Sequence, residues 1–399
     1  MPRYSSIHFP MTTNPLVPIV IKYDTYMDLT SEDMGRLLSA LKHPDRIREI
    51  GLSLNSGDLD KFFEATKCPF PALESLAICD RFHRLLKIPA TFLKGTNLRL
   101  RLRSLELDRI SLKSVSRLLS SATALTNLSL KFDICCQASL LSGLLSQLQG
   151  LPHLRRLNLA TSLKNRPGQL SRLTEPKGSF PLAKLTSFHY RGYSKFLDFF
   201  MMGFEAPSLQ DIGIYVYDTT LTPLPFPHLP QFFNGAEKHY HAVHVLIKQC
   251  YFDFSLLAPS EGVGHHSLRF RLQLPPFRGS EIENWMMEAT SVFSAKLSTV
   301  EELVLIRDTS QEEVIPWRTF LERFPSVKEF QIEGTKNHRV ASALQPYHSG
   351  TNLSVLPALE RITFRPEFSS DHSSELAVFQ PFVTARQRAG RQVQVTCFP

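Results

Sequence analysis

Short apolar runs return along this chain in one phrase, a turn followed by apolar positions spaced as L-x-x-L-x-L. Clear examples are residues 70–78, 151–159, 324–332 and 356–364, such as Leu151-Pro152-His153-Leu154-Arg155-Arg156-Leu157-Asn158-Leu159. The last two apolar positions of a phrase lie on one side of an extended strand, because strand side chains alternate. Each phrase therefore predicts a short strand with one buried face and one polar face.

The first apolar residue of each phrase, its anchor, recurs at a nearly even spacing. The anchors are Ile47, Leu73, Leu102, Leu125, Leu154, Leu185, Leu209, Ala242, Leu268, Val300, Val327 and Leu359. Eleven steps separate the first anchor from the last, so the mean step is about 28 residues, within the range of leucine-rich repeats. Ala242 and Leu268 are the least regular, and the register there is open by a residue or more.

Between the strands, apolar residues at three- and four-residue intervals predict amphipathic helices. These segments are 56–66, 111–122, 136–148, 194–204, 281–297 and 311–324. Strands that alternate with helices bury one face of each element against its neighbours. The predicted fold class is therefore α/β, a leucine-rich-repeat solenoid (horseshoe) with a parallel concave sheet, helices on the convex side and irregular repeats.

The pattern divides the chain into three predicted parts. Residues 1–42 form an N-terminal leader and capping helix, with a strand at 17–23 and a helix capped by Thr30, with Asp33 in the capping-box position. Residues 43–365 form the array of about twelve repeats. Residues 366–399 form a C-terminal cap, a helix at 374–389 and a strand at 393–397, which covers the apolar end of the array. The polar or proline-rich segments 164–180, 219–230 and 337–355 are expected to be inserted loops.

The composition indicates a folded protein with a mild excess of positive charge, and it does not identify a partner. The chain has 399 residues, 43% hydrophobic and 21% charged, which is typical of a folded protein. A formal charge of +8 permits acidic partners without requiring nucleic acid. Six cysteines without a C-x-x-C motif indicate reduced thiols, and no signal peptide or membrane span is evident. We expect a cytoplasmic or nuclear protein with no membrane and no nucleic-acid partner.

Motifs of enzyme chemistry are missing from the sequence. It contains no G-x-x-x-x-G-K, no G-x-G-x-x-G and no G-x-S-x-G. We therefore expect no catalytic residues and no cofactor. His239 and His241 would share one face of a strand as metal ligands do, while His244 would face the other way and Cys250 follows. No second cluster completes such a site, so a polar loop is the favoured interpretation and no metal site is predicted.

The run from Leu98 to Arg103 alternates leucine with arginine, which predicts three guanidinium groups on one strand face. A solvated sheet surface is the favoured interpretation. The alternative is a grip for an acidic peptide or a phosphate by forked hydrogen bonds.

Several short stretches resemble one family. The chain is similar over nearly its whole length to fungal, mainly mushroom-type, F-box-like leucine-rich-repeat proteins. The matching stretches are His43-Pro44-Asp45-Arg46-Ile47, Pro69-Phe70-Pro71-Ala72-Leu73, Ala206-Pro207-Ser208-Leu209 and residues 382–390. The resemblance implies an adaptor that selects substrates for a cullin-based ubiquitin ligase. The F-box motif of such proteins typically opens with Leu-Pro-x-Glu and has no recognisable match in residues 1–42. The ligase link is therefore expected only if an F-box lies upstream.

In a horseshoe of this kind, the residues between the apolar positions project from the concave sheet. The predicted partner-binding residues are Glu106, Asp108, Lys131, Asn158, His189, Arg191, Tyr215, Lys248, Arg271 and Gln273, and Ser53, Cys79, Glu333 and Arg365 extend the surface. Acidic and basic members fall at different points along it, which favours a partner of mixed charge. We expect a non-enzymatic protein-binding module. The alternatives are a stand-alone scaffold or sensor fragment with no ligase link, and less plausibly a His-based metal protein.

Overall fold

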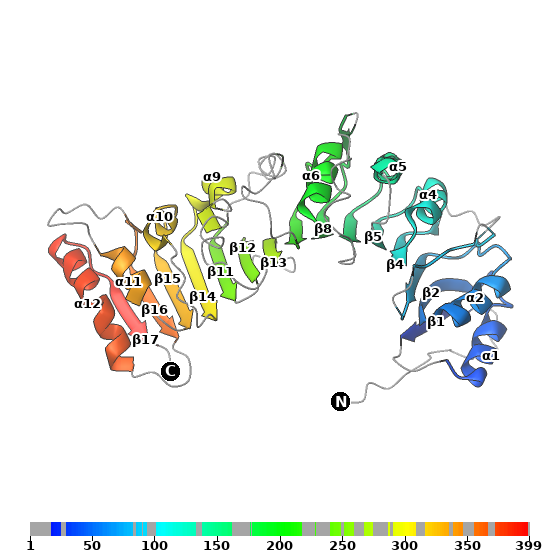
Figure 1. Cartoon of the computed structure of the whole chain (residues 1–399), viewed down its shortest axis with the longest axis horizontal. Coiled ribbons are helices and arrows are strands. Elements are labelled where there is room, and N and C mark those ends of the chain that lie inside the picture. The colour runs from blue at the N-terminus through cyan, green and yellow to red at the C-terminus, as the bar shows by residue number, and fades with distance from the viewer. Residues whose placement is uncertain are drawn as a thin grey trace. The chain divides into compact units, whose positions relative to one another are not determined.

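The computed structural model of the chain divides into two compact units, Met1–Leu209 and Gln210–Pro399. The residues that it describes are 17–24, 29–82, 85–89, 91–93, 101–132, 138–161, 176, 178–217, 228, 240–248, 251–258, 267–273, 286–287, 290–308, 316–334, 338–345, 355–365 and 372–397. Within each unit the helices lie along one face of the strands (Figure 1).

The first unit alternates strands and helices. Its strands are β1 (Ile19–Asp24), β2 (Ile47–Leu54), β3 (Ser75–Asp80), β4 (Ser104–Ile110), β5 (Asn127–Phe132), β6 (Arg156–Thr161), β7 (Phe180–Pro181), β8 (Ser187–Gly192) and β9 (Phe204–Glu205). Its helices are α1 (Ser31–Ala40), α2 (Ser56–Ala65), α4 (Leu112–Ser121), α5 (Ala138–Gln149) and α6 (Ser194–Gly203). Strands β1 to β6 and then β8 lie side by side in chain order, and all of these pairs are parallel. The short strands β7 and β9 pair separately.

Side-chain caps mark the starts of α1 and α2 in this unit. The Thr30 hydroxyl accepts a hydrogen bond from the Asp33 backbone N–H at 3.1 Å and caps α1, as the sequence predicts. The Asn55 side chain accepts from the Asp58 backbone N–H at 2.9 Å and caps α2. Both caps satisfy donors that the first helical turn leaves without intrahelical partners.

Alternation fixes which strand residues enter the core. In β5 and β8 every second residue is buried, and the residues between them are partly or fully exposed. The buried ones pack against α6 and the residue that follows it: the rings of Tyr190 and Phe200 lie 6.4 Å apart, and those of Phe188 and Phe204, the first residue of β9, lie 5.5 Å apart. We call the side of the strands that points away from the helices the helix-free face.

One backbone arrangement recurs at the start of successive strands. The carbonyl of Arg103 accepts hydrogen bonds from the N–H groups of Thr126 and Asn127, at 2.8 and 2.9 Å. The carbonyls of Glu74, Thr126, Arg155, His241, Glu301 and Lys328 each accept two such bonds from the strand that follows in space. Because each carbonyl lies just ahead of its own strand, it holds the next strand parallel and in register.

The second unit also has one helix-covered sheet, with one exception to its parallel order. Its strands are β10 (Asp211–Val216), β11 (Ala242–Lys248), β12 (Tyr251–Leu257), β13 (Ser267–Gln273), β14 (Glu302–Asp308), β15 (Glu329–Gly334), β16 (Arg361–Arg365) and β17 (Gln394–Cys397). Its helices are α9 (Ser294–Leu297), α10 (Trp317–Leu321), α11 (His338–Leu344) and α12 (His372–Arg388). The strand order is β10, β13, β12, β11, β14, β15, β16, β17, and β12 runs antiparallel to both of its neighbours.

The antiparallel strand corrects the sequence-based prediction of an entirely parallel sheet in chain order. Two residues join β11 to β12, which is too short for a helical crossover, so the chain turns back on itself. The predicted register also moves here. Ala242 pairs with Glu302, so the position equivalent to the anchor Val300 is Tyr240, two residues earlier. Leu268 pairs with Ile212, inside β10, and is likewise not an anchor.

All twelve residues predicted as anchors are nevertheless buried, with exposed fractions between 0% and 5%. The helix predicted at 311–324 forms over Trp317–Leu321, and the one predicted at 281–297 includes helical residues at 286–287 and 290–292 before α9. Helix α11 lies where a loop was predicted. The alternating run at 98–103 is also not a strand where it is described, because β4 begins at Ser104.

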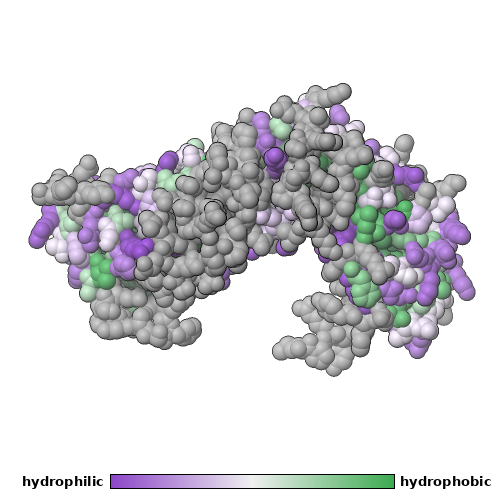
Figure 2. Space-filling view, in the orientation of Figure 1, coloured by the Kyte–Doolittle hydropathy of each residue, from purple (hydrophilic) through white to green (hydrophobic). Residues whose placement is uncertain are grey.

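Both ends of the chain add strands to these sheets. Strand β1 pairs with β2, and β17 pairs with β16. Hydrophilic side chains follow the outer rim of the N-terminal end, over α1 and α2 (Figure 2). Helix α12 covers β16 through the rings of Phe379 and Phe364, which lie 4.4 Å apart. The described residues include no helix that is long and apolar enough to cross a membrane.

A buried arginine joins α12 to the turn ahead of β16. The Arg386 guanidinium is fully buried, donates hydrogen bonds to the carbonyls of Val355 at 3.0 Å, Pro357 at 3.1 Å and Leu356, and lies over the Phe382 ring. Burial, and secondarily the charge of Arg391, lowers the pKa of Arg386 to about 10. The carbonyl dipoles offset this desolvation penalty.

Replacing Arg386 with methionine should therefore destabilise the second unit by about 2–4 kcal/mol, because it removes charge-assisted hydrogen bonds and leaves buried carbonyls without donors. The exposed Arg388 on the same helix is the control, and Arg388→Met should change stability by less than about 0.5 kcal/mol. Urea denaturation measures both variants. Equal midpoints for the two would contradict this role of Arg386.

Gly334 and Gly390, both in the second unit, differ in how closely other backbone atoms approach them. Both have positive φ, 108° and 74°. A Cβ at Gly334 would lie 1.9 Å from the Arg307 carbonyl oxygen, whereas one at Gly390 has no atom within 4 Å. Gly390→Ala should cost about 1 kcal/mol from its φ alone. Gly334→Ala should cost clearly more, because β14 must also move, and thermal unfolding of the two variants makes the comparison.

Candidate functional site

The predicted binding residues of the first unit fall on the helix-free face in two adjacent rows. Cross-strand register places Glu106, Ser129, Asn158 and His189 side by side, which we call the first row. It also places Ser53, Cys79, Asp108, Lys131, Ala160 and Arg191 side by side, which we call the second row. All six residues predicted for this unit therefore lie on one surface, contributed by β4, β5, β6 and β8.

The first row is open to solvent. Glu106, Asn158 and His189 are exposed. The Asn158 amide donates to the Ser129 hydroxyl at 3.3 Å across the strands. This row therefore presents an acid, an amide and an imidazole on a rigid backbone.

Charges in the second row are paired more closely than the sequence indicates. The Lys131 ammonium lies 2.9 Å from the Asp108 carboxylate, and the Arg109 Nε lies 3.8 Å from it. The Asp108 side chain is 22% exposed. The Lys131 ammonium therefore offsets the charge of Asp108, and Glu106 is the exposed acid of the neighbouring first row.

Cys79 lies in the second row, beside Asp108. Its Sγ lies 3.4 Å from Asp108 Oδ2. Burial first, and then the charge and hydrogen bond of Asp108, raise the pKa of the Cys79 thiol from 9.0 to about 12. The thiolate, which is the nucleophilic form, is therefore scarce at neutral pH.

In the second unit one row of residues crosses the helix-free face from β10 to β16. It runs through Tyr215, Arg271, Asp253, Leu246, Ile306, Glu333 and Arg365. Tyr215 and Arg271 are thus neighbours, with the Arg271 guanidinium carbon 5.8 Å from the Tyr215 ring centroid. Lys248 pairs with Tyr251, and Tyr251 with Gln273, so the predicted Lys248 and Gln273 occupy the adjacent row.

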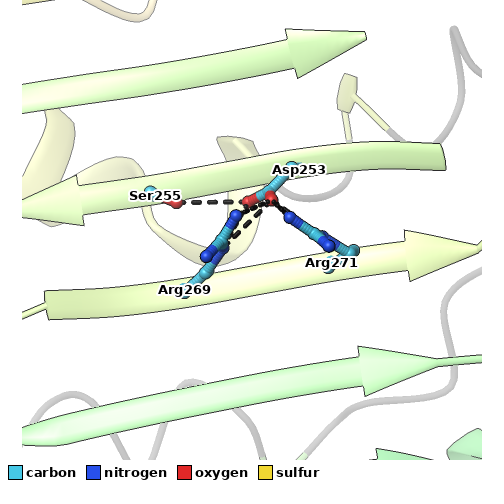
Figure 3. Close-up of polar contacts among 4 residues, drawn as sticks. All are labelled: Asp253, Ser255, Arg269 and Arg271. Atoms are coloured by element: carbon cyan, nitrogen blue, oxygen red, sulfur yellow. Dashed lines mark hydrogen bonds and ion pairs between the residues drawn. The ribbon is translucent and has the colours of Figure 1, made fainter. Parts of the chain in front are cut away.

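Asp253 is the main residue that sequence reasoning missed. Its side chain is 3% exposed and lies between Arg269 and Arg271 (Figure 3). The alternation of Phe252, Asp253 and Phe254 signals a strand, but the repeat period leaves no place for one between Ala242 and Leu268. Arg271, predicted as a basic partner-binding residue, is 28% exposed on this face and donates a hydrogen bond to Asp253 at 2.8 Å.

Two other basic residues on the helix-free face of this unit are also paired with acids. Arg361 lies 2.7 Å from Glu329, and Arg365 lies 3.2 Å from Glu333. The predicted mixed charge of the surface is therefore present as cross-strand pairs. At this exposure such pairs contribute little stability and mainly define the pattern that a partner would meet.

Among the described residues, the histidines considered as metal ligands do not lie together in a metal site. His241 Nδ1 lies 3.9 Å from a Glu301 carboxylate oxygen, and His244 stands on β11 opposite Ser255. His239 and Cys250 lie outside the described residues. Within the described ranges, no three His, Cys, Asp or Glu side chains gather as metal ligands would.

Comparison of the chain with protein-family models and with curated proteins finds no match.

The raised pKa of Cys79 yields a chemical prediction. At pH 8 about one Cys79 thiol in ten thousand should be ionised, against about one in ten at the ordinary value. Iodoacetamide should therefore modify Cys79 much more slowly than the partly exposed Cys68 in native protein, followed by peptide mass spectrometry.

Asp108→Asn should accelerate the modification of Cys79. The substitution removes the carboxylate, whose negative charge and hydrogen bond both raise the pKa of the Cys79 thiol. Each unit by which the pKa falls gives about a tenfold higher rate, as long as the pKa stays above the pH. Modification of Cys68 is the internal control. An unchanged rate at Cys79 would mean that burial alone protects it.

Proposed function

We propose that the chain is a leucine-rich-repeat solenoid that binds a protein partner on its helix-free face and catalyses no reaction. The observation that carries the proposal is the set of in-register rows on that face. They present acidic, basic, amide and aromatic side chains on a scaffold fixed by backbone hydrogen bonds. Side chains held on strands bind with a small loss of conformational entropy, which favours recognition of a surface of defined shape.

The carbonyls that each accept two backbone hydrogen bonds at the starts of strands support the proposal of a solenoid. The same bond joins β4 to β5 and β14 to β15, although these strands are far apart in the sequence. One supersecondary unit used repeatedly, with its buried anchor just ahead of the strand, accounts for both.

The size of the face suits a protein partner. In the first unit seven strands lie side by side, which at about 4.8 Å per strand gives a width of about 29 Å. Strands of six residues are about 20 Å long. The resulting area, about 600 Å², is close to the roughly 800 Å² that each partner contributes to a standard interface.

Resemblance to fungal F-box-like leucine-rich-repeat proteins supports a narrower role, substrate recognition for a cullin-based ubiquitin ligase. A stand-alone scaffold or sensor is the alternative. Affinity capture from cells of the source organism separates them, because a ligase receptor carries its adaptor and cullin into the captured material and a scaffold does not.

The test of face binding uses two sets of exposed residues of the first unit. Glu106→Arg, Asn158→Arg and His189→Glu alter the first row of the helix-free face. The matched set alters exposed helix residues, Glu64→Arg, Arg117→Glu and Lys195→Glu.

Changes on the helix-free face should reduce capture of the partner at least about tenfold, a loss of about 1.4 kcal/mol. The helix set should leave capture within about twofold, with circular dichroism confirming that both sets fold. Loss of capture with the helix set alone would place the partner on the other face and reject the proposal.

A further inference from the structure

Two arginines of β13 share one buried carboxylate. Arg269 donates to Asp253 Oδ2 through Nε at 3.0 Å and Nη2 at 2.7 Å, and Arg271 donates to the same oxygen through Nε at 2.8 Å (Figure 3). The Ser255 hydroxyl donates to the other oxygen of Asp253 at 3.2 Å. The carboxylate is therefore surrounded by donors from its own strand and from the neighbouring strand.

Exposure differs sharply across this cluster. Asp253 is 3% exposed, while Arg271 is 28% and Arg269 is 54% exposed. Solvent and any ligand therefore meet guanidinium groups rather than the carboxylate. Among the described residues on this face of β10, β12 and β13, the other acid is Asp211, at the start of β10, diagonal to Arg269.

The arrangement differs from the other ion pairs of the same unit. Arg361 and Arg365 each have a glutamate of their own on β15. At Asp253 two guanidiniums share one carboxylate, and the Arg271 group also stacks near the Tyr215 ring. Groups held in this way lose little freedom when they bind a ligand, and planar guanidinium groups match the geometry of carboxylates and phosphates.

The spacing of the two arginines specifies the ligand further. Arg269 and Arg271 are separated by one residue on a strand, so their side chains leave the same face about 6.6 Å apart. An extended peptide has the same repeat. Acidic residues at alternate positions of such a peptide would face both guanidiniums at once.

We propose that Arg269 and Arg271, oriented by Asp253, bind an extended acidic segment of a protein partner with carboxylates at alternate positions. The inference rests on the proposed function, because it specifies the chemistry of the partner. A peptide rather than a nucleic acid is favoured by the single pair of guanidiniums and by the glutamates that neutralise Arg361 and Arg365 on the same face.

The test uses two fluorescein-labelled peptides of identical composition in fluorescence anisotropy. In one, two glutamates in a neutral serine and threonine background are separated by one residue. In the other they are adjacent, so that only one points to the sheet when the peptide is extended. Wild-type protein should bind the alternate peptide at least about threefold more tightly.

Variants locate the site. Arg269→Gln should weaken binding of the alternate peptide by about tenfold, because it removes a charge-assisted contact while Arg271 still pairs with Asp253. Arg269→Lys keeps the charge without the fork and should retain an intermediate affinity. The control Arg361→Gln removes an exposed arginine from the same face and should change affinity less than twofold.

Three results would overturn the inference: equal binding of the two peptides or none, an effect of Arg361→Gln equal to that of Arg269→Gln, or a stronger affinity for a single-stranded oligonucleotide of equal charge. If changes in the first row still reduced capture of the partner, the proposed function would hold and only the peptide site at Arg269 and Arg271 would be rejected. If the first-row variants also left capture of the partner unchanged, both the proposed function and this site would be rejected.

Discussion

The carbonyls just ahead of β3, β4, β5, β6, β11, β14 and β15 each accept two backbone N–H groups from the next strand in space, and the arrangement of this molecule depends on that contact. The bond from Asn127 to Arg103 and the bond from Glu329 to Glu301 fix strand pairs in opposite halves of the chain in the same way. Because strand side chains alternate with a period of two, a slip of one residue would turn every leucine outward. Register, core and surface rows are therefore set together.

The hairpin of β11 and β12 shows what happens where that arrangement is interrupted. A two-residue connection cannot hold a crossover helix, so β12 reverses direction and β13 reverses again. β13 thereby returns parallel to β10, and β11 lies parallel to β14. The sheet keeps its common direction on both sides, and a strand with a buried aspartate lies in the middle.

Electrostatics on the helix-free face follows from register rather than from net charge. The formal charge of +8 describes the whole chain, but Asp108 meets Lys131 and Glu333 meets Arg365 because the strands place them opposite one another. Asp253 meets Arg269 and Arg271 for the same reason. A partner of this face would encounter local patterns of charge, which determine specificity more than total affinity.

The sequence by itself determined most strands and helices, the helix-capping role of Thr30 and the face to which residues such as Glu106 and Asn158 belong. These depend on local periodicity and on capping chemistry, which neighbouring residues carry. Only the tertiary structure decided that Asp108 pairs with Lys131, that Tyr240 takes the place of the anchor Ala242, and that Asp253 lies between two arginines. Each depends on which strands lie side by side, and this is set by hydrogen bonds between segments distant in the chain and by the length of a single connection.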